Sequence, residues 1–132
     1  MKAKLKWTDG MQFVARADDG SAVIMDSRDG RSGPAPMEMV LMGVAGCTAI
    51  DVVSIMQKKR ADISRFEVTI EGEQAENHPK RFTRIKVVYT LYGTGIKPKA
   101  VEQAIELSEK KYCSATASLN AEVEHAYEIK DA

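Results

Sequence analysis

Residues 36–60 read PMEMVLMGVAGCTAIDVVSIMQKKR and are the most informative segment of the chain. Pro36 suits the first position of a helix, Glu38 complements the positive end of the helix dipole, and three basic residues complement the negative end. Residues 39–50 carry no charge, and apolar residues fall on every side of the predicted helix. This pattern predicts a long central helix that is buried on all sides.

A transmembrane helix is the alternative interpretation of the same segment. Glu38 and Asp51 leave fewer than the roughly 18 uncharged residues that a membrane span usually needs, so we favour a core helix and no membrane association. Gly43 and Gly46 each lower helix propensity by about 1 kcal/mol relative to alanine. Because glycine lets another backbone approach closely, we expect tight packing around Cys47.

Short alternating segments precede the helix. Residues 2–26 alternate polar and apolar side chains, with turn sequences at Asp9-Gly10 and at residues 18–20 (DDG). They predict three strands in an antiparallel meander. Residues 27–36 are polar and rich in glycine and proline, which is typical of an exposed loop.

The segments after the helix complete an α+β pattern. The predicted elements are a hairpin of residues 65–73 and 81–92, a second helix from Pro98 to about residue 110, a short helical stretch at 115–119 and a strand at 122–130. We expect helices on one side of antiparallel strands. The length predicts one domain covering residues 1–132, and a helix that is apolar all round favours a homodimer that covers it.

The charges and the N-terminus bear on partners and location. Nineteen basic and nineteen acidic residues give a formal net charge of zero, which argues against a nucleic-acid partner. The first ten residues lack the apolar stretch of a signal peptide, so we expect a cytoplasmic protein.

Two cysteines, Cys47 and Cys113, are the residues best suited to chemistry. In a reducing compartment a permanent disulfide is not expected, whereas a catalytic or redox role is a realistic option. Two thiols are too few for a structural zinc site, and His78 and His125 show no ligand spacing to them. We therefore expect no metal and, in the absence of a phosphate-binding glycine loop, no cofactor. The alternatives without chemistry are that Cys47 is a small buried apolar residue and that Cys113 is a partly exposed free thiol.

The central segment, followed 66 residues later (113 minus 47) by KYCS, resembles the OsmC/Ohr family, and more narrowly its YhfA-type branch. The resemblance covers essentially the whole chain. It implies an OsmC-like fold and an intertwined homodimer with its active sites at the subunit interface. It also implies that Cys47 attacks a peroxide and that Cys113 resolves the product to a disulfide.

The resemblance also suggests which residues orient the substrate. The Ohr branch has a glutamate directly after the proline that opens the helix, where this chain has Met37. We therefore assign the substrate-orienting role of that glutamate to Glu38, one residue later. The alternative is that Glu38 only stabilises the start of the helix. The arginine of that branch corresponds to Arg16, Arg28 or Arg31, and the sequence does not choose among them. Nine positions (47 minus 38) place Glu38 and Cys47 on opposite sides of an ideal helix. Asp51, four residues after Cys47, would oppose thiolate formation.

The implied function is thiol-dependent reduction of organic hydroperoxides in oxidative-stress defence, with a dithiol as the reductant. Two alternatives remain open. One is a non-catalytic binding protein for a small apolar or electrophilic ligand, and the other is a thiol redox sensor. Slow peroxide consumption with saturable binding would indicate the first, and a disulfide that forms readily without turnover would indicate the second.

Overall fold

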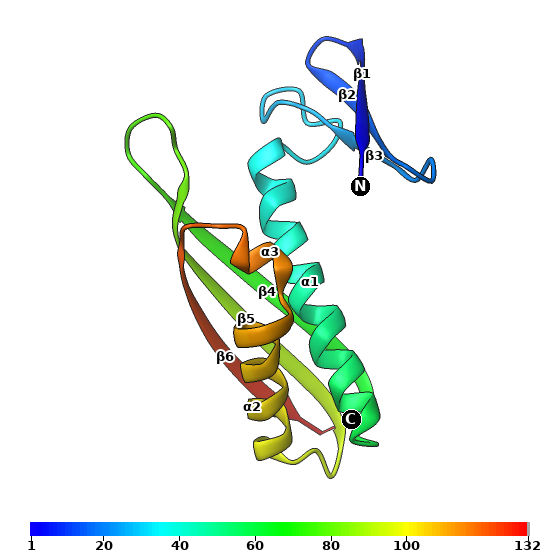
Figure 1. Ribbon diagram of the computed structural model, residues 1–132, viewed down its shortest axis with the longest axis vertical. Coiled ribbons are helices and arrows are strands. Elements are labelled where there is room, and N and C mark those ends of the chain that lie inside the picture. The colour runs from blue at the N-terminus through cyan, green and yellow to red at the C-terminus, as the bar shows by residue number, and fades with distance from the viewer. Residues whose placement is uncertain (132) are drawn as a thin grey trace. The chain divides into compact units, whose positions relative to one another are not determined.

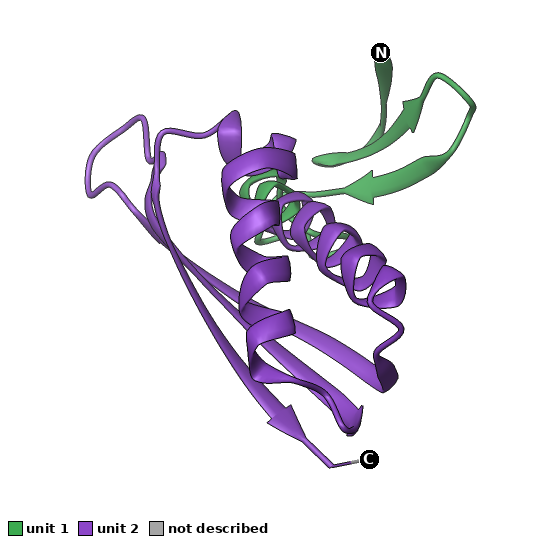
Figure 2. Cartoon of the chain, turned by 60° about the horizontal axis from the view of Figure 1, so that its bottom comes forward, with its two compact units in different colours: residues 1–40 green, residues 41–132 purple. Residues whose placement is uncertain are grey.

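The computed structural model describes residues 1–131 of the chain. They belong to two compact units, Met1–Val40 and Leu41–Ala132, which Figure 2 colours separately. Figure 1 labels the elements, which in chain order are β1 (Ala3–Asp9), β2 (Gln12–Ala17), β3 (Ala22–Met25), α1 (Pro36–Lys58), β4 (Asp62–Gln74), β5 (Phe82–Thr94), α2 (Pro98–Leu107), η1 (Ser108–Tyr112), α3 (Ser114–Ala117) and β6 (Glu122–Lys130). Helices combined with mainly antiparallel strands confirm the α+β class.

The first unit contains the predicted meander. Its sheet has the order β1-β2-β3, and both strand pairs are antiparallel, with Phe13 of β2 opposite Trp7 on one side and Met25 on the other. Gly20 in the second turn has a φ of 91°, a left-handed conformation that glycine adopts without steric strain. The turn sequences therefore predicted the strand ends correctly.

The second unit is a sheet in the order β4-β5-β6, with α1 and α2 side by side on one face of it (Figures 1 and 2). β4 and β5 form the predicted antiparallel hairpin, which extends further at its open end, to Asp62 and Thr94, than the sequence indicated. Alternate side chains of β5 are fully buried, namely those of Ile85, Val87, Tyr89 and Leu91. This alternation makes β5 the centre of the core, because a central strand is covered by a neighbour on each side.

The last strand differs from the expected antiparallel arrangement. β6 pairs with β5 in parallel register, with Val123 beside Ile85 and Ile129 beside Leu91. The chain between the two strands passes through α2, η1 and α3, and a helical crossover of this kind returns the next strand in the same direction. The second sheet is therefore mixed.

The second helix follows the predicted pattern, and it ends in an unusual turn. In the sequence, Val101, Ala104, Ile105 and Ser108 recur at helical spacing, and the structure buries all four side chains. The α-helix stops at Leu107, and η1 continues it as one turn of π-helix. The backbone N–H of Cys113 closes this turn by donating to the carbonyl of Ser108 at 2.7 Å.

The central helix is buried along one stripe rather than on all sides. Val44, Thr48, Val52 and Met56 recur every four residues and are almost fully buried. The opposite stripe of α1 is exposed and includes Met42 (52% exposed) and Ile50 (72% exposed). By length and composition α1 is also long and apolar enough to cross a bilayer, a property that core helices of soluble proteins share.

The two glycines of α1 do not make the close contacts that we expected. A Cβ placed on Gly43 or on Gly46 would have no heavy atom within 4 Å among the described residues. Both glycines lie on exposed positions of the helix. Tight packing around Cys47 therefore does not come from these glycines within a single chain.

Candidate active site

Two elements far apart in the sequence carry the thiols. Cys47 lies in the middle of α1, half-buried, one residue before the buried stripe position Thr48. Cys113 directly follows η1 and caps the start of α3. The wide π-turn positions this cysteine, because its closing hydrogen bond fixes the Cys113 backbone to Ser108.

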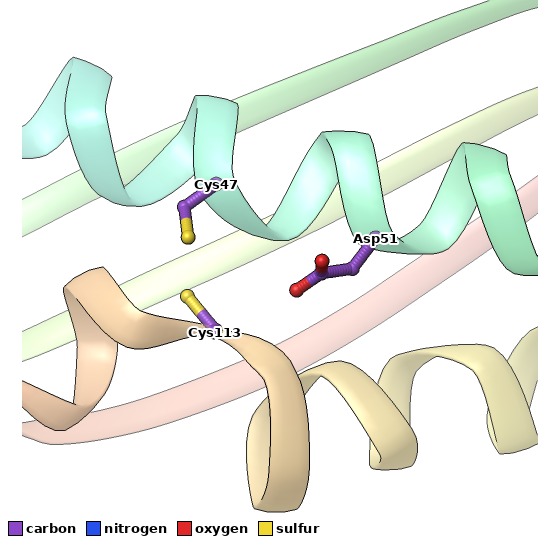
Figure 3. Close-up of side chains that lie close together, drawn as sticks. All are labelled: Cys47, Asp51 and Cys113. Atoms are coloured by element: carbon purple, nitrogen blue, oxygen red, sulfur yellow. The ribbon is translucent and has the colours of Figure 1, made fainter.

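The fold of the second unit brings the two thiols together. Cys47, Asp51 and Cys113 each present one ligand-type atom, and these atoms all lie within 4.8 Å of one another. In Figure 3 the two sulfur atoms point toward each other across the space between α1 and the segment after η1, and the Asp51 carboxylate points into the same space. Both cysteines are free thiols. The spatial pairing of Cys47 with Cys113, which the sequence could not show, is present.

Cys113 occupies an enclosed position. Its side chain is 4% exposed, so the alternative of a partly exposed free thiol is wrong. Burial raises the pKa of the Cys113 thiol above its ordinary value and the nearby Cys47 adds to this, while the hydroxyl and backbone N–H of Thr116 act in the opposite direction. The Thr116 hydroxyl lies 3.0 Å from the sulfur, and the Thr116 N–H donates to it at 3.4 Å.

Asp51 connects the thiol pair to a buried chain of hydroxyl groups. Ser108 donates to Oδ2 of Asp51 at 2.9 Å, and Ser108 lies 2.9 Å from Thr48. Thr48 in turn lies 2.6 Å from the Tyr89 hydroxyl, which lies 3.0 Å from Nδ1 of His125. Within the described part of the second unit, no lysine, arginine or histidine nitrogen lies within 4.0 Å of the Asp51 carboxylate.

The carboxylate determines the direction of every hydrogen bond in this chain. Each hydroxyl has one proton, so Ser108 donates to Asp51, Thr48 donates to Ser108, and Tyr89 donates to Thr48. Tyr89 must then accept from Nδ1–H of His125. Burial raises the pKa of Tyr89 to about 12, so the phenol keeps its proton at neutral pH.

His125 ends the chain as a neutral ring. Burial lowers the pKa of His125, and Glu109 opposes this shift across 3.9 Å. Its Nε2 is buried and accepts no hydrogen bond from the described residues. This buried position at the end of the hydroxyl chain suits a structural role for His125.

A groove opens beside the thiol cluster. It has a volume of about 510 Å³. Its lining includes the polar residues Asp51 and Ser54 and two lysines, Lys58 and Lys59. The rest of the lining is apolar or aromatic: Ile50, Ile55, Leu107 and Tyr112. A small molecule with an apolar body therefore has space next to Asp51.

The predicted orienting residues lie in the first unit. Glu38 accepts a hydrogen bond from the Ala35 N–H at 2.9 Å, which together with Arg31 at 3.6 Å holds the pKa of its carboxyl below the ordinary value. This backbone contact satisfies a free N–H at the start of α1, as the simpler alternative predicted. Arg16 donates to the Gly20 carbonyl at 3.0 Å, and Arg28 is exposed in the loop. Substrate-orienting roles for these four residues stay predictions.

Sequence reasoning missed most of the groups around the thiols. From the sequence, Asp51 is only an obstacle to thiolate formation, Ser108 is only a buried position of the second helix, and Thr48, Tyr89 and Thr116 have no role at the site. Two signals were available: a hydroxyl residue directly after Cys47, and Ser108 at the fourth inward position of the second helix. Their meeting depends on contacts between residues 41 and 60 positions apart.

The comparisons with known proteins agree with the architecture. The family model described as OsmC-like protein matches residues 28–128. Protein YhfA of Escherichia coli strain K12 is 42% identical over 131 residues, which covers 98% of each chain.

Two solved structures extend the similarity. A hypothetical protein from Aquifex aeolicus is 28% identical with a TM-score of 0.89, and the match covers 99% of this chain and 96% of that one. The organic hydroperoxide resistance protein OhrB of Bacillus subtilis shares the fold at 16% identity and a TM-score of 0.59, covering 97% and 98%. The family-model match over residues 28–128 and the 42% identity over nearly the whole length establish that this chain belongs to the OsmC-like protein family.

Proposed function

We propose that this protein is a thiol peroxidase that reduces organic hydroperoxides with Cys47 and Cys113. The observation that supports it best is the position of the two free sulfurs within 4.8 Å of each other on separate elements of one unit. Membership in a family that includes organic hydroperoxide resistance proteins supports the same chemistry. The groove beside Asp51 offers space for the organic part of the substrate.

Cys47 is the better candidate for the attacking thiol. It is half-buried and therefore reachable, whereas Cys113 is 4% exposed. Burial also raises the pKa of Cys113, which disfavours its reactive thiolate form. A buried, protonated thiol beside the attacking one is suited to the second step, in which it reacts with the sulfenic acid.

The cycle balances with these two residues and an external dithiol. The Cys47 thiolate attacks one peroxide oxygen, the O–O bond breaks, and the departing alkoxide takes a proton, which gives a Cys47 sulfenic acid and an alcohol. The Cys113 sulfur then attacks the Cys47 sulfur, and one water leaves as the disulfide forms. A dithiol reductant returns two electrons and two protons to restore both thiols. We propose no further cofactor.

The setting of this activity also follows as a proposal. The chain would act in the cytoplasm, where a dithiol reductant is present and structural disulfides are rare. A homodimer would cover the exposed stripe of α1 that includes Met42 and Ile50. Sedimentation of wild type against Met42→Lys measures this, with the variant expected to shift toward the monomer; identical sedimentation as monomers would contradict it.

The peroxidase proposal can be tested by thiol counting. The chain has two cysteines, so each lost thiol is assigned directly. Reduced wild type, Cys47→Ser and Cys113→Ser are treated with one equivalent of cumene hydroperoxide in the presence of a chelator and analysed by mass spectrometry. We expect rapid loss of both thiols into an intramolecular disulfide in wild type, a trapped sulfenic acid at Cys47 in Cys113→Ser, and no fast reaction in Cys47→Ser.

Three other outcomes would contradict the proposal. Survival of both thiols would rule out peroxide reduction by this cysteine pair and would favour a ligand-binding protein. Loss over hours without preference between the cysteines would indicate nonspecific oxidation. A disulfide that forms rapidly and is not turned over by dihydrolipoamide, reduced thioredoxin or dithiothreitol would indicate a redox sensor.

A further inference from the structure

We propose that the reduced pair Cys47 and Cys113, together with Asp51, binds one zinc ion. The three residues converge from two elements of the second unit, and their ligand-type atoms lie within 4.8 Å of one another (Figure 3). This function is separate from peroxide reduction and does not depend on it. It also revises the expectation of no metal, which considered the cysteines and histidines without Asp51.

The spacing of the three donors suits zinc. Zn–S bonds of about 2.3 Å and Zn–O bonds of about 2.1 Å in a tetrahedral site place two sulfurs about 3.8 Å apart and a sulfur and an oxygen about 3.6 Å apart. Donors already within 4.8 Å would need to move by no more than about 1 Å. Thiolate ligands select zinc over magnesium and calcium, which prefer oxygen donors.

The charges of the site favour a cation. Cys47, Asp51 and Cys113 are each negative when they bind a metal, and the described residues of the second unit place no cationic nitrogen within 4.0 Å of the Asp51 carboxylate. Three such groups close together repel one another unless a positive charge lies between them. A divalent ion would balance two of the three charges.

Neighbouring groups already hold the donors in position. Ser108 donates to Oδ2 of Asp51 at 2.9 Å and so orients the carboxylate, and the Thr48 hydroxyl lies 2.9 Å from that of Ser108. Thr116 directs its N–H and hydroxyl at the Cys113 sulfur. Hydrogen bonds of this kind orient the ligands of metal sites and tune their affinity.

Three protein ligands define an exchangeable site rather than a structural one. The fourth position would hold water, as in zinc sites that retain an open position. Binding releases the two thiol protons, and oxidation of the pair to a disulfide removes two ligands and expels the ion. Zinc and peroxide would therefore compete for the same two sulfurs.

The test uses cobalt(II) as a spectroscopic substitute for zinc. The reduced full chain, freed of metal with a chelator and desalted, is titrated with cobalt and then with zinc. We expect near-ultraviolet thiolate-to-cobalt absorption that saturates at one ion per chain and disappears when zinc displaces cobalt. Cys47→Ser and Cys113→Ser should each abolish saturation at one equivalent.

Matched variants assign the third ligand. Asp51→Asn should weaken binding, and Ser108→Ala should weaken it by about 10- to 100-fold, the usual effect of losing a supporting hydrogen bond. Glu71→Gln, which removes an exposed carboxylate on β4, should leave the affinity unchanged. Equal affinity in Asp51→Asn and Glu71→Gln would overturn the assignment of Asp51.

A second measurement needs no variant. Zinc should slow N-ethylmaleimide alkylation of both wild-type thiols, and chelator should restore the rate. Unchanged alkylation, or cobalt spectra without thiolate bands, would overturn the site. Peroxide reduction is measured separately on chelator-treated protein, so that failure of either proposal is seen independently of the other.

Discussion

The Thr48 hydroxyl lies 2.6 Å from the Tyr89 hydroxyl, and this contact joins the central helix to the central strand one residue away from Cys47. Both side chains are almost fully buried. The chain of donors from His125 to Asp51 passes through this pair, so the geometry of the thiol site depends on buried polar groups as well as on apolar packing. Buried networks of this kind stabilise a fold only when each member keeps its partners.

Removing the Tyr89 hydroxyl should therefore destabilise the protein. Tyr89→Phe leaves Thr48 and His125 each without one buried partner, and we expect the free energy of unfolding to fall by about 1–3 kcal/mol. Urea denaturation measures it. Tyr127→Phe, which removes a more exposed hydrogen bond to Glu102, is the matched control and should lower the free energy of unfolding less. Equal losses in the two variants would contradict a structural role for the buried chain.

The two thiols should differ in reactivity. Cys113 is 4% exposed and burial raises its pKa, whereas Cys47 is half-buried. We expect iodoacetamide to alkylate Cys47 several-fold faster than Cys113 at neutral pH in chelator-treated protein. Peptide mass spectrometry at timed intervals gives both rates from one sample. The reverse order would argue against Cys47 as the attacking thiol.

The stability of the protein should fall as the pH falls below that of neutral solution. Burial lowers the pKa of His125 in the folded state, so the unfolded chain binds more protons between that pKa and the ordinary value of about 6.5. The free energy of unfolding therefore rises with pH in this window, with a slope of at most about 1.4 kcal/mol per pH unit. The protein loses this stability as the pH drops from about 6.5 toward the folded-state pKa of His125. Glu109, which faces Nε2, reduces the effect, and Tyr89 stays protonated throughout.

Denaturation of wild type and His125→Gln from pH 8 to pH 5.5 checks this prediction. The variant should lose the part of the slope that comes from His125. His78→Gln changes an exposed histidine in the β4–β5 loop and should keep the wild-type slope. A wild-type slope that persists in His125→Gln would assign the pH dependence to other groups.

Two methionines of α1 should respond very differently to truncation. Met56 is fully buried, and Met56→Ala should lower the free energy of unfolding by about 2–5 kcal/mol, because it removes apolar contacts and leaves a cavity. Met42 is 52% exposed, and Met42→Ala in the same helix should change the free energy by less than about 0.5 kcal/mol in the monomer. A large loss at Met42 that depends on protein concentration would indicate that a second copy covers this stripe.

Local patterns in the sequence determined the elements of this fold. Proline and charge placement marked the start and end of α1, alternation marked the strands, and the spacing of Val101, Ala104, Ile105 and Ser108 identified the buried face of α2. These signals are readable because side-chain direction repeats every 3.6 residues in a helix and every two in a strand. The two cysteine segments also carried the family resemblance.

Tertiary structure decided how those elements meet. The parallel pairing of β6, the single buried stripe of α1 and the π-turn before Cys113 depend on how helices pack on the sheet, which no local pattern encodes. The folded chain also brings a carboxylate oxygen of Asp51 to within 4.8 Å of both sulfurs, whereas the sequence placed Asp51 near Cys47 alone. The physical reason is that Asp51 and Ser108 are 57 positions apart, and only the packing of α1 against the end of α2 brings them to 2.9 Å.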